Sequence, residues 1–138
     1  MPHQIIEYSA NLGQRLDIAQ LVQALHQCAA DMEPLPLAGL RTRAYPSQTF
    51  AIADQHPDNA FVAVYLRIGQ GRSEALRQDL GKKLFDCLCE HTAALYAQTP
   101  LALSYEVQEI DPATRWNKNN LRDFLHHRET SQEHGSNE

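Results

Sequence analysis

The sequence predicts an α/β (α+β) fold in which two consecutive β-α-β units form a four-stranded mixed sheet with both helices on one face. One observation, combined with a general rule of topology, predicts this class. A strand-like segment, an amphipathic helix and a second strand-like segment follow one another twice along the chain. Such units almost always close with a right-handed crossover and parallel strands. Joining two of them edge to edge leaves the other sheet face without a helix, so we expect its apolar side chains to be covered by self-association.

The first unit begins at once. Residues 3–8 alternate and are rich in isoleucine, which is typical of a strand. Pro34 ends the helix that follows, because proline cannot continue it. Residues 37–45 then indicate a second strand that contains Arg41 and Arg43. The apolar positions of the helix recur every three or four residues and form one face: Leu12, Leu16, Ala19, Val22, Leu25, Ala29 and Met32.

The second unit follows a polar connection, residues 46–59, which contains two prolines. Residues 60–68 are the strongest strand candidate of the chain. Ser73 is a candidate N-cap for the second helix, which ends before Pro100. Residues 101–107 indicate the fourth strand. One side of this helix carries Leu76, Leu80, Leu84, Cys87, Leu88, His91 and Leu95.

The sequence indicates one domain, residues 1–127, followed by a tail, residues 128–138. Residues 110–125 indicate a turn followed by a short helix or arm. The tail is polar and lacks aliphatic residues, so we expect it to be disordered.

Composition narrows the classes of partner. The chain has 138 residues, enough for one domain with a real core. A net charge of −5 argues against nucleic acid as the main partner. The sequence has no long apolar run that would suggest a membrane-spanning segment. The 3 cysteines fit neither a disulfide framework nor a zinc site, which favours a reducing cytoplasm. The 7 histidines are scattered, with no spacing typical of metal ligands.

The first candidate catalytic residue is Pro2. Methionine is usually removed when the next residue is small, so we expect Pro2 to become the N-terminus of the mature protein. Its nitrogen is then a secondary amine. Burial beside cations lowers the pKa of such an amine, which makes it a general base near neutral pH. The alternative is that Pro2 only permits removal of Met1.

Arg41 and Arg43 are two residues apart on a predicted strand, so they point to the same face. Two unpaired guanidiniums are too costly for a core. They therefore lie on a solvated face, at a subunit interface or over an anionic ligand.

The segment Gly69-Gln70-Gly71-Arg72-Ser73 resembles a nucleotide-binding turn only superficially. Its third glycine is missing and no Gly-Lys-Ser or Gly-Lys-Thr follows, so we reject a dinucleotide or phosphate loop. A strand-to-helix turn with Arg72 nevertheless suits a carboxylate.

Five segments in the same order resemble one family. They are Pro2-His3, the segments 36–43, 66–73 and 101–106, and Asn117-Lys118-Asn119-Asn120. Together they are similar to the 5-carboxymethyl-2-hydroxymuconate delta-isomerase family of the tautomerase superfamily, over Pro2 to about Leu125. The tail beyond Leu125 extends past what this family usually has.

The resemblance implies a homotrimer and an isomerase that needs no cofactor or metal and acts in aromatic catabolism, in the homoprotocatechuate pathway. The amino-terminal proline is the implied base that shifts a double bond in an unsaturated 2-hydroxy or 2-keto polycarboxylic acid. Arg41 and Arg72 are the implied carboxylate ligands. Arg43 either assists them or forms an interface ion pair. Trp116 either forms an apolar wall that keeps the proline amine neutral or serves only in packing.

Two alternatives stay open. One is another reaction on the same scaffold, such as phenylpyruvate-type keto–enol tautomerism or dehalogenation, because a fold does not fix the chemistry. The other is a trimeric binding protein without catalytic activity.

Overall fold

A computed structural model describes residues 1–135 and contains one four-stranded sheet. Its strands are β1 (His3–Ser9), β2 (Arg41–Ser47), β3 (Ala60–Gly69) and β4 (Leu101–Ile110), in the order β2-β1-β3-β4. β2 runs parallel to β1 and β4 runs parallel to β3, whereas the central β1–β3 pair is antiparallel. The predicted mixed sheet, built from two β-α-β units joined edge to edge, is confirmed.

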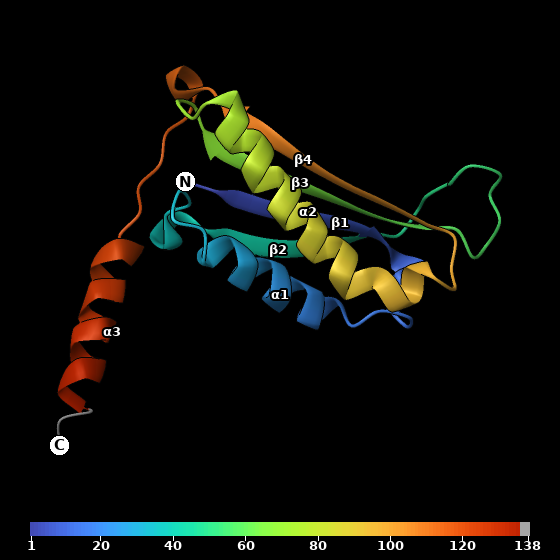
Figure 1. Cartoon of the computed structure of the whole chain (residues 1–138), viewed down its shortest axis with the longest axis horizontal. Coiled ribbons are helices and arrows are strands. Elements are labelled where there is room, and N and C mark those ends of the chain that lie inside the picture. The colour runs from blue at the N-terminus through green and yellow to red at the C-terminus, as the bar shows by residue number, and fades with distance from the viewer. Residues whose placement is uncertain (136–138) are drawn as a thin grey trace.

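Two helices, α1 (Ile18–Ala30) and α2 (Glu74–Tyr96), lie side by side on the same face of this sheet (Figure 1). Asp17 caps α1 by accepting a hydrogen bond from Gln20 N, and Ser73 caps α2 through Leu76 N, as predicted for Ser73. The core between the helices and the sheet is aliphatic. Its fully buried members include Ile6, Leu21, Leu25, Val62, Val64, Leu66, Leu84 and Leu88.

The first unit differs from the prediction at two boundaries. The first helix begins at Ile18, because Asp17 provides the cap, while Ala10–Leu12 form a separate 3₁₀ turn, η1. The second strand begins at Arg41, because Leu37–Gly39 form another 3₁₀ turn, η2. Leu12 is nevertheless fully buried, so its apolar character was interpreted correctly but its element was not.

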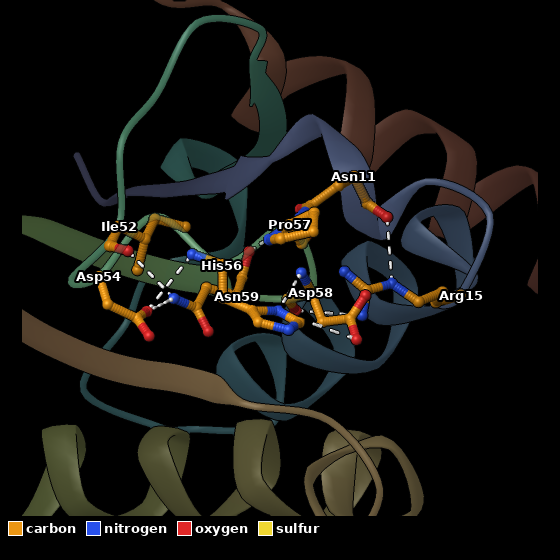
Figure 2. A network of polar contacts seen from close by, with 8 residues as sticks. All are labelled: Asn11, Arg15, Ile52, Asp54, His56, Pro57, Asp58 and Asn59. Atoms are coloured by element: carbon orange, nitrogen blue, oxygen red, sulfur yellow. Dashed lines mark hydrogen bonds and ion pairs between the residues drawn. The ribbon is translucent and has the colours of Figure 1, made fainter.

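The connection between β2 and β3 lies at the end of the sheet opposite the N-terminus. Figure 2 shows the polar side chains that hold it. Asn59 Nδ2 donates to Asp54 Oδ1 at 2.8 Å and to Ile52 O at 3.0 Å. Asn11 Nδ2, just beyond β1, donates to Asn59 O at 2.8 Å. The segment is therefore fixed by hydrogen bonds within it and by one from Asn11, without forming a strand.

After β4 the chain forms a third 3₁₀ turn, η3 (Pro112–Thr114), and a helix, α3 (Leu121–Gly135). Figure 1 shows α3 as an arm that points away from the sheet and its two helices. The tail from Arg128 onward, which was expected to be disordered, is thus helical as far as Gly135, because α3 continues into it. Residues 136–138 of that tail lie outside the described residues, and the domain boundary at 127 stays a prediction.

The uncovered sheet face is more polar than the sequence suggested. Pairing and alternation place His3, Arg41, Arg43 and Arg67 at one end of this face. Glu106, Gln108 and Ser104 share it on β4. The face whose apolar side chains were expected to need a cover therefore carries charged side chains too, because the odd positions of β1, β2 and β3 hold charged as well as aromatic residues.

Within residues 1–135, no helix has the length and apolar character needed to cross a membrane.

Candidate active site

The start of β1 brings the N-terminus to the end of the sheet where β2 begins. Pro2 is buried, and its carbonyl oxygen accepts the backbone N–H of Arg41 at 3.2 Å. Met1 precedes it and packs on η2, where a β-carbon on Gly39 would lie only 2.6 Å from Met1 Sδ. Asn119 Nδ2 reaches the same sulfur at 3.8 Å and donates to Ala38 O at 3.1 Å. Pro2 is thus held by β2, while the segment before α3 contacts Met1.

A buried polar network fixes β1 behind this terminus. Gln4 is fully buried, and its Nε2 donates to Leu25 O on α1 and to Thr42 Oγ1 on β2, both at 3.1 Å. Its Oε1 accepts from the Tyr105 hydroxyl on β4 at 2.9 Å. Burial raises the pKa of Tyr105, so the phenol stays protonated and able to donate. Because all polar atoms of the Gln4 amide side chain have partners, the network holds the strand in one register.

An arginine cluster surrounds His3 on the uncovered face; we use this name for Arg41, Arg43, Arg67 and Arg115. Arg41 Nη1 lies 3.4 Å and Arg115 Nη2 lies 3.3 Å from His3 Nε2. Arg43 Nη1 lies 3.3 Å from His3 Nδ1. Arg67 lies on β3, directly opposite His3 of β1. Arg41 and Arg43 thus share a face, as predicted.

The cluster holds positive charge without a matching carboxylate. Burial and then the four guanidiniums lower the pKa of His3 to about 4, so the imidazole is neutral at pH 7. Among the residues whose side chains the structure describes, no Asp or Glu pairs with any arginine of the cluster. An anionic ligand is the partner that such an arrangement fits.

The terminal amine, here that of Met1, lies close to these charges. Burial is the largest cause that lowers its pKa below 8.0, followed by the charges of Arg115, Arg72 and Arg41. Desolvation and like charge both disfavour the ammonium form. An amine at this end of the chain is therefore neutral in a larger fraction of molecules than an ordinary terminus.

Arg72 lies in the turn after β3 and is one of the charges that lower the pKa of the terminal amine. Gly71, with a φ of +117°, turns the chain after β3 so that Arg72 reaches back toward the segment before η2. Arg72 Nη1 donates to Gly69 O at 3.1 Å and Nη2 donates to Pro34 O at 2.8 Å. These bonds fix the guanidinium in place and leave its other N–H groups for a carboxylate.

Trp116 does not form a wall within the single chain, because its side chain is 86% exposed. A hollow of about 540 Å³ does adjoin Met1, and it is lined by η2 and the start of α3. A larger, apolar hollow of about 570 Å³ lies between α2 and β4, away from the arginines. In the part of the chain that the structure describes, no group of three or more His, Cys, Asp or Glu residues is arranged to hold a metal ion.

The sequence analysis missed four residues of this region. His3 and Asn119 were quoted without a role, and Arg115 was not singled out. Arg67 lies five positions before Arg72, but strand parity does not relate the two side chains, since β3 ends at Gly69 and Arg72 lies beyond it in the turn. The one sequence signal available for His3 was strand parity: His3 begins the first strand, and Arg41 and Arg43 occupy alternate positions of the strand that pairs with it.

Comparison with known proteins identifies the family. A model of the 5-carboxymethyl-2-hydroxymuconate isomerase family matches residues 2–125. The chain belongs to this family. An isomerase of Escherichia coli named 5-carboxymethyl-2-hydroxymuconate Delta-isomerase is 38% identical over 121 residues, which are 88% of this chain and 96% of that protein. The sequence-based assignment to the family is thereby confirmed, and the chain is an isomerase.

Solved structures of two proteins named for the same activity resemble the isomerase throughout. The 5-carboxymethyl-2-hydroxymuconate isomerase of Deinococcus radiodurans R1 has a TM-score of 0.83 at 39% identity, covering 90% of this chain and 93% of that one. A 5-carboxymethyl-2-hydroxymuconate delta-isomerase has a TM-score of 0.81 at 27% identity, covering 91% and 93%. A more distant structure, a fused 4-OT described as an asymmetric trimer, has a TM-score of 0.60 at 15% identity. At that distance the likeness shows only the tautomerase-like fold.

Proposed function

We propose that the isomerase converts 5-carboxymethyl-2-hydroxymuconate, or a closely related unsaturated 2-hydroxy polycarboxylic acid, by moving a proton along its conjugated system. The support is that the terminal amine, here that of the half-buried Met1 next to Pro2, lies near Arg41, Arg72 and Arg115 at one end of the sheet, where burial and these charges lower its pKa. This combination suits a polyanionic substrate that must lose a proton to a nearby base. The names of the relatives supply the substrate.

In this proposal Pro2 is the first residue of the mature enzyme and its amine is the general base. The neutral amine takes the proton of the 2-hydroxyl group and becomes an ammonium. The electron pair then lies on the conjugated dienolate, and the ammonium returns the proton to a carbon further along the chain. Substrate and product are isomers, so no other reactant enters the balance.

Arg41 and Arg72 bind substrate carboxylates and stabilise the charge of the dienolate. The Arg72 guanidinium is fixed before the substrate arrives, because it is bonded to two backbone carbonyls, and the Arg41 guanidinium lies beside His3. Prealigned charges of this kind stabilise a developing anion without reorganisation. Arg43 assists from the adjacent position on β2.

The proposal is tested by turnover on a panel of substrates. We expect kcat/KM for 5-carboxymethyl-2-hydroxymuconate to exceed that for phenylpyruvate or 3-chloroacrylate by at least about a hundredfold, because the smaller acids leave charged groups of the site unpaired. Ultraviolet absorbance of the conjugated acid gives the rate. A higher kcat/KM for phenylpyruvate or chloroacrylate would show that the proposed substrate is wrong. Binding without turnover, with the proline amine verified as free by mass spectrometry, would indicate a binding protein.

We also propose a homotrimer, in which the uncovered face, the arm α3 and Trp116 contact neighbouring subunits. Three features support it: β2 and β4 are both edge strands, an apolar hollow adjoins β4, and α3 exposes Leu121 and Phe124. In this trimer the Trp116 side chain forms an apolar wall beside the amine of a neighbouring subunit. An arginine such as Arg43 is also available for an ion pair between subunits.

Assembly is checked by light scattering after size-exclusion chromatography. We expect the mass of three chains at micromolar concentration, because the edge strands and exposed apolar residues gain partners on association. A stable monomer would contradict self-association. A dimer would keep the exposed-surface argument and contradict the three-fold arrangement.

Action in the cytoplasm, within aromatic catabolism by the homoprotocatechuate pathway, completes the proposal.

A further inference from the structure

Arg115 stands out because it comes from neither a strand nor a helix of the sheet layer. It follows η3 in an extended conformation, with φ of −130° and ψ of 130°, and is half-buried. The last residue of β4, Ile110, pairs with Gly69, so this loop returns to the sheet end that holds the N-terminus. Its guanidinium thereby meets a side chain 112 positions earlier, at 3.3 Å from His3 Nε2.

His3 cannot satisfy the three guanidiniums that contact it. A neutral imidazole has one acceptor nitrogen and one N–H donor. Arg41 and Arg115 both approach Nε2, while Arg43 approaches Nδ1. At least one of these guanidiniums therefore points an N–H group at a ring N–H that cannot accept it. The neutral ring acts as a spacer that tolerates the arginines close together and leaves their N–H groups free for an anion.

Three carboxylates have to be recognised in the proposed substrate. Muconate is a dicarboxylate, and the carboxymethyl substituent adds a third. Arg41 and Arg72 are already assigned to two of them. Of the remaining arginines, Arg43 lies two residues further along β2 and Arg67 is exposed on the far side of β1. The charge of Arg115 acts on the terminal amine more strongly than that of any other residue.

We propose that Arg115 is the specificity-determining residue that binds the third carboxylate, that of the carboxymethyl group, with His3 as a positioning residue that holds its guanidinium beside Arg41. This assignment rests on the proposed function. It goes beyond it in naming the part of the substrate that separates a tricarboxylate from a simple muconate.

Binding of two inert anions tests the assignment without requiring turnover. Isothermal calorimetry compares propane-1,2,3-tricarboxylate with glutarate, which has the same backbone and lacks the central carboxylate. We expect Arg115→Gln to weaken binding of the tricarboxylate by about tenfold to a hundredfold, the factor for one lost charge-assisted hydrogen bond. Binding of glutarate should weaken by less than about threefold, since the loss of a surface charge that makes no direct contact is largely screened by salt. Arg128→Gln, which removes an exposed charge on α3, is the matched control and should change neither.

Equal weakening of both anions by Arg115→Gln would overturn the assignment, because the arginine would then supply only general positive charge. No change in either anion would also overturn it. Arg115→Lys keeps the charge and should retain part of the preference for the tricarboxylate. This variant is also the control for misfolding. If its thermal unfolding is unchanged but it shows no preference for the tricarboxylate, the assignment is again contradicted.

Turnover gives two further readouts. At a pH above the inflection, where the amine is fully deprotonated, Arg115→Gln should raise KM for 5-carboxymethyl-2-hydroxymuconate while leaving kcat/KM for 2-hydroxymuconate nearly unchanged. Removing this charge should also move the inflection of kcat/KM to higher pH, since Arg115 helps to lower the pKa of the amine. If wild-type enzyme turns over neither acid, the proposed function fails, and the calorimetric comparison still decides the role of Arg115.

Discussion

Enzyme that retains Met1 is expected to turn over its substrate about 10²- to 10⁴-fold more slowly than enzyme that begins at Pro2, the contribution typical of a positioned general base. With Met1 in place the nitrogen of Pro2 belongs to an amide, whose lone pair is delocalised into the carbonyl group. Such a nitrogen cannot take the proton. The two forms can be produced with and without inhibition of methionine removal and compared by kcat/KM after mass spectrometry.

Retention of Met1 should leave the fold intact. Met1 packs against Gly39 and Asn119 at the rim of the site, and Pro2 is bonded to Arg41 through its carbonyl oxygen and not through its nitrogen. Thermal unfolding and oligomeric mass should therefore be the same in both forms. Full activity with Met1 verified in place would exclude Pro2 as the base.

The pH profile belongs to the same experiment. The amine acts only when deprotonated, so kcat/KM of the mature enzyme should rise with pH and level off above the pKa of the amine. Burial and the neighbouring arginines lower the pKa of the Met1 amine at this end of the chain. The same two causes should place the inflection for Pro2 below the pKa of a free proline amine. Pro2→Ala retains a primary amine at nearly the same place and should keep a measurable part of the activity with a similar profile.

The sheet layer could be predicted because its determinants are local. Alternation in residues 60–68, helical spacing from Leu76 and the stop at Pro100 each act over a few neighbouring residues. Two β-α-β units in succession then restrict the topology to very few arrangements. The boundaries that failed, at Ile18 and Arg41, depend on 3₁₀ turns whose stability comes from packing on the rest of the chain.

The candidate site was only partly accessible from the sequence. Strand parity placed Arg41 and Arg43 together correctly. Arg115 is brought to His3 by the path of the loop after β4, which no spacing in the sequence encodes. The role of Arg67 depends on the antiparallel pairing of β1 with β3. Tertiary proximity of this kind has no periodic signal.

Among the arginines, Arg41→Ala is expected to cost about 1.5–3 kcal/mol in kcat/KM, the usual worth of a hydrogen bond to a charged group. The backbone N–H of Arg41 is bonded to Pro2, so its guanidinium starts from the residue next to the base. Arg67→Ala should cost much less. Arg67 is exposed and affects the pKa of His3, but it is not among the charges that act on the terminal amine.

Arg72→Ala should reduce kcat/KM by a similar amount to Arg41→Ala, yet the two variants should differ in stability. Arg72 donates to the carbonyls of Gly69 and Pro34, so its loss also leaves two backbone acceptors without a partner. Thermal unfolding should therefore shift downward for Arg72→Ala and stay near the wild-type value for Arg41→Ala, whose contact with His3 is long. Steady-state kinetics and calorimetric scanning of the three alanine variants measure both effects. If Arg67→Ala were the crippling change and Arg41→Ala silent, the substrate would lie over β3 and the proposed site at Pro2 would be wrong.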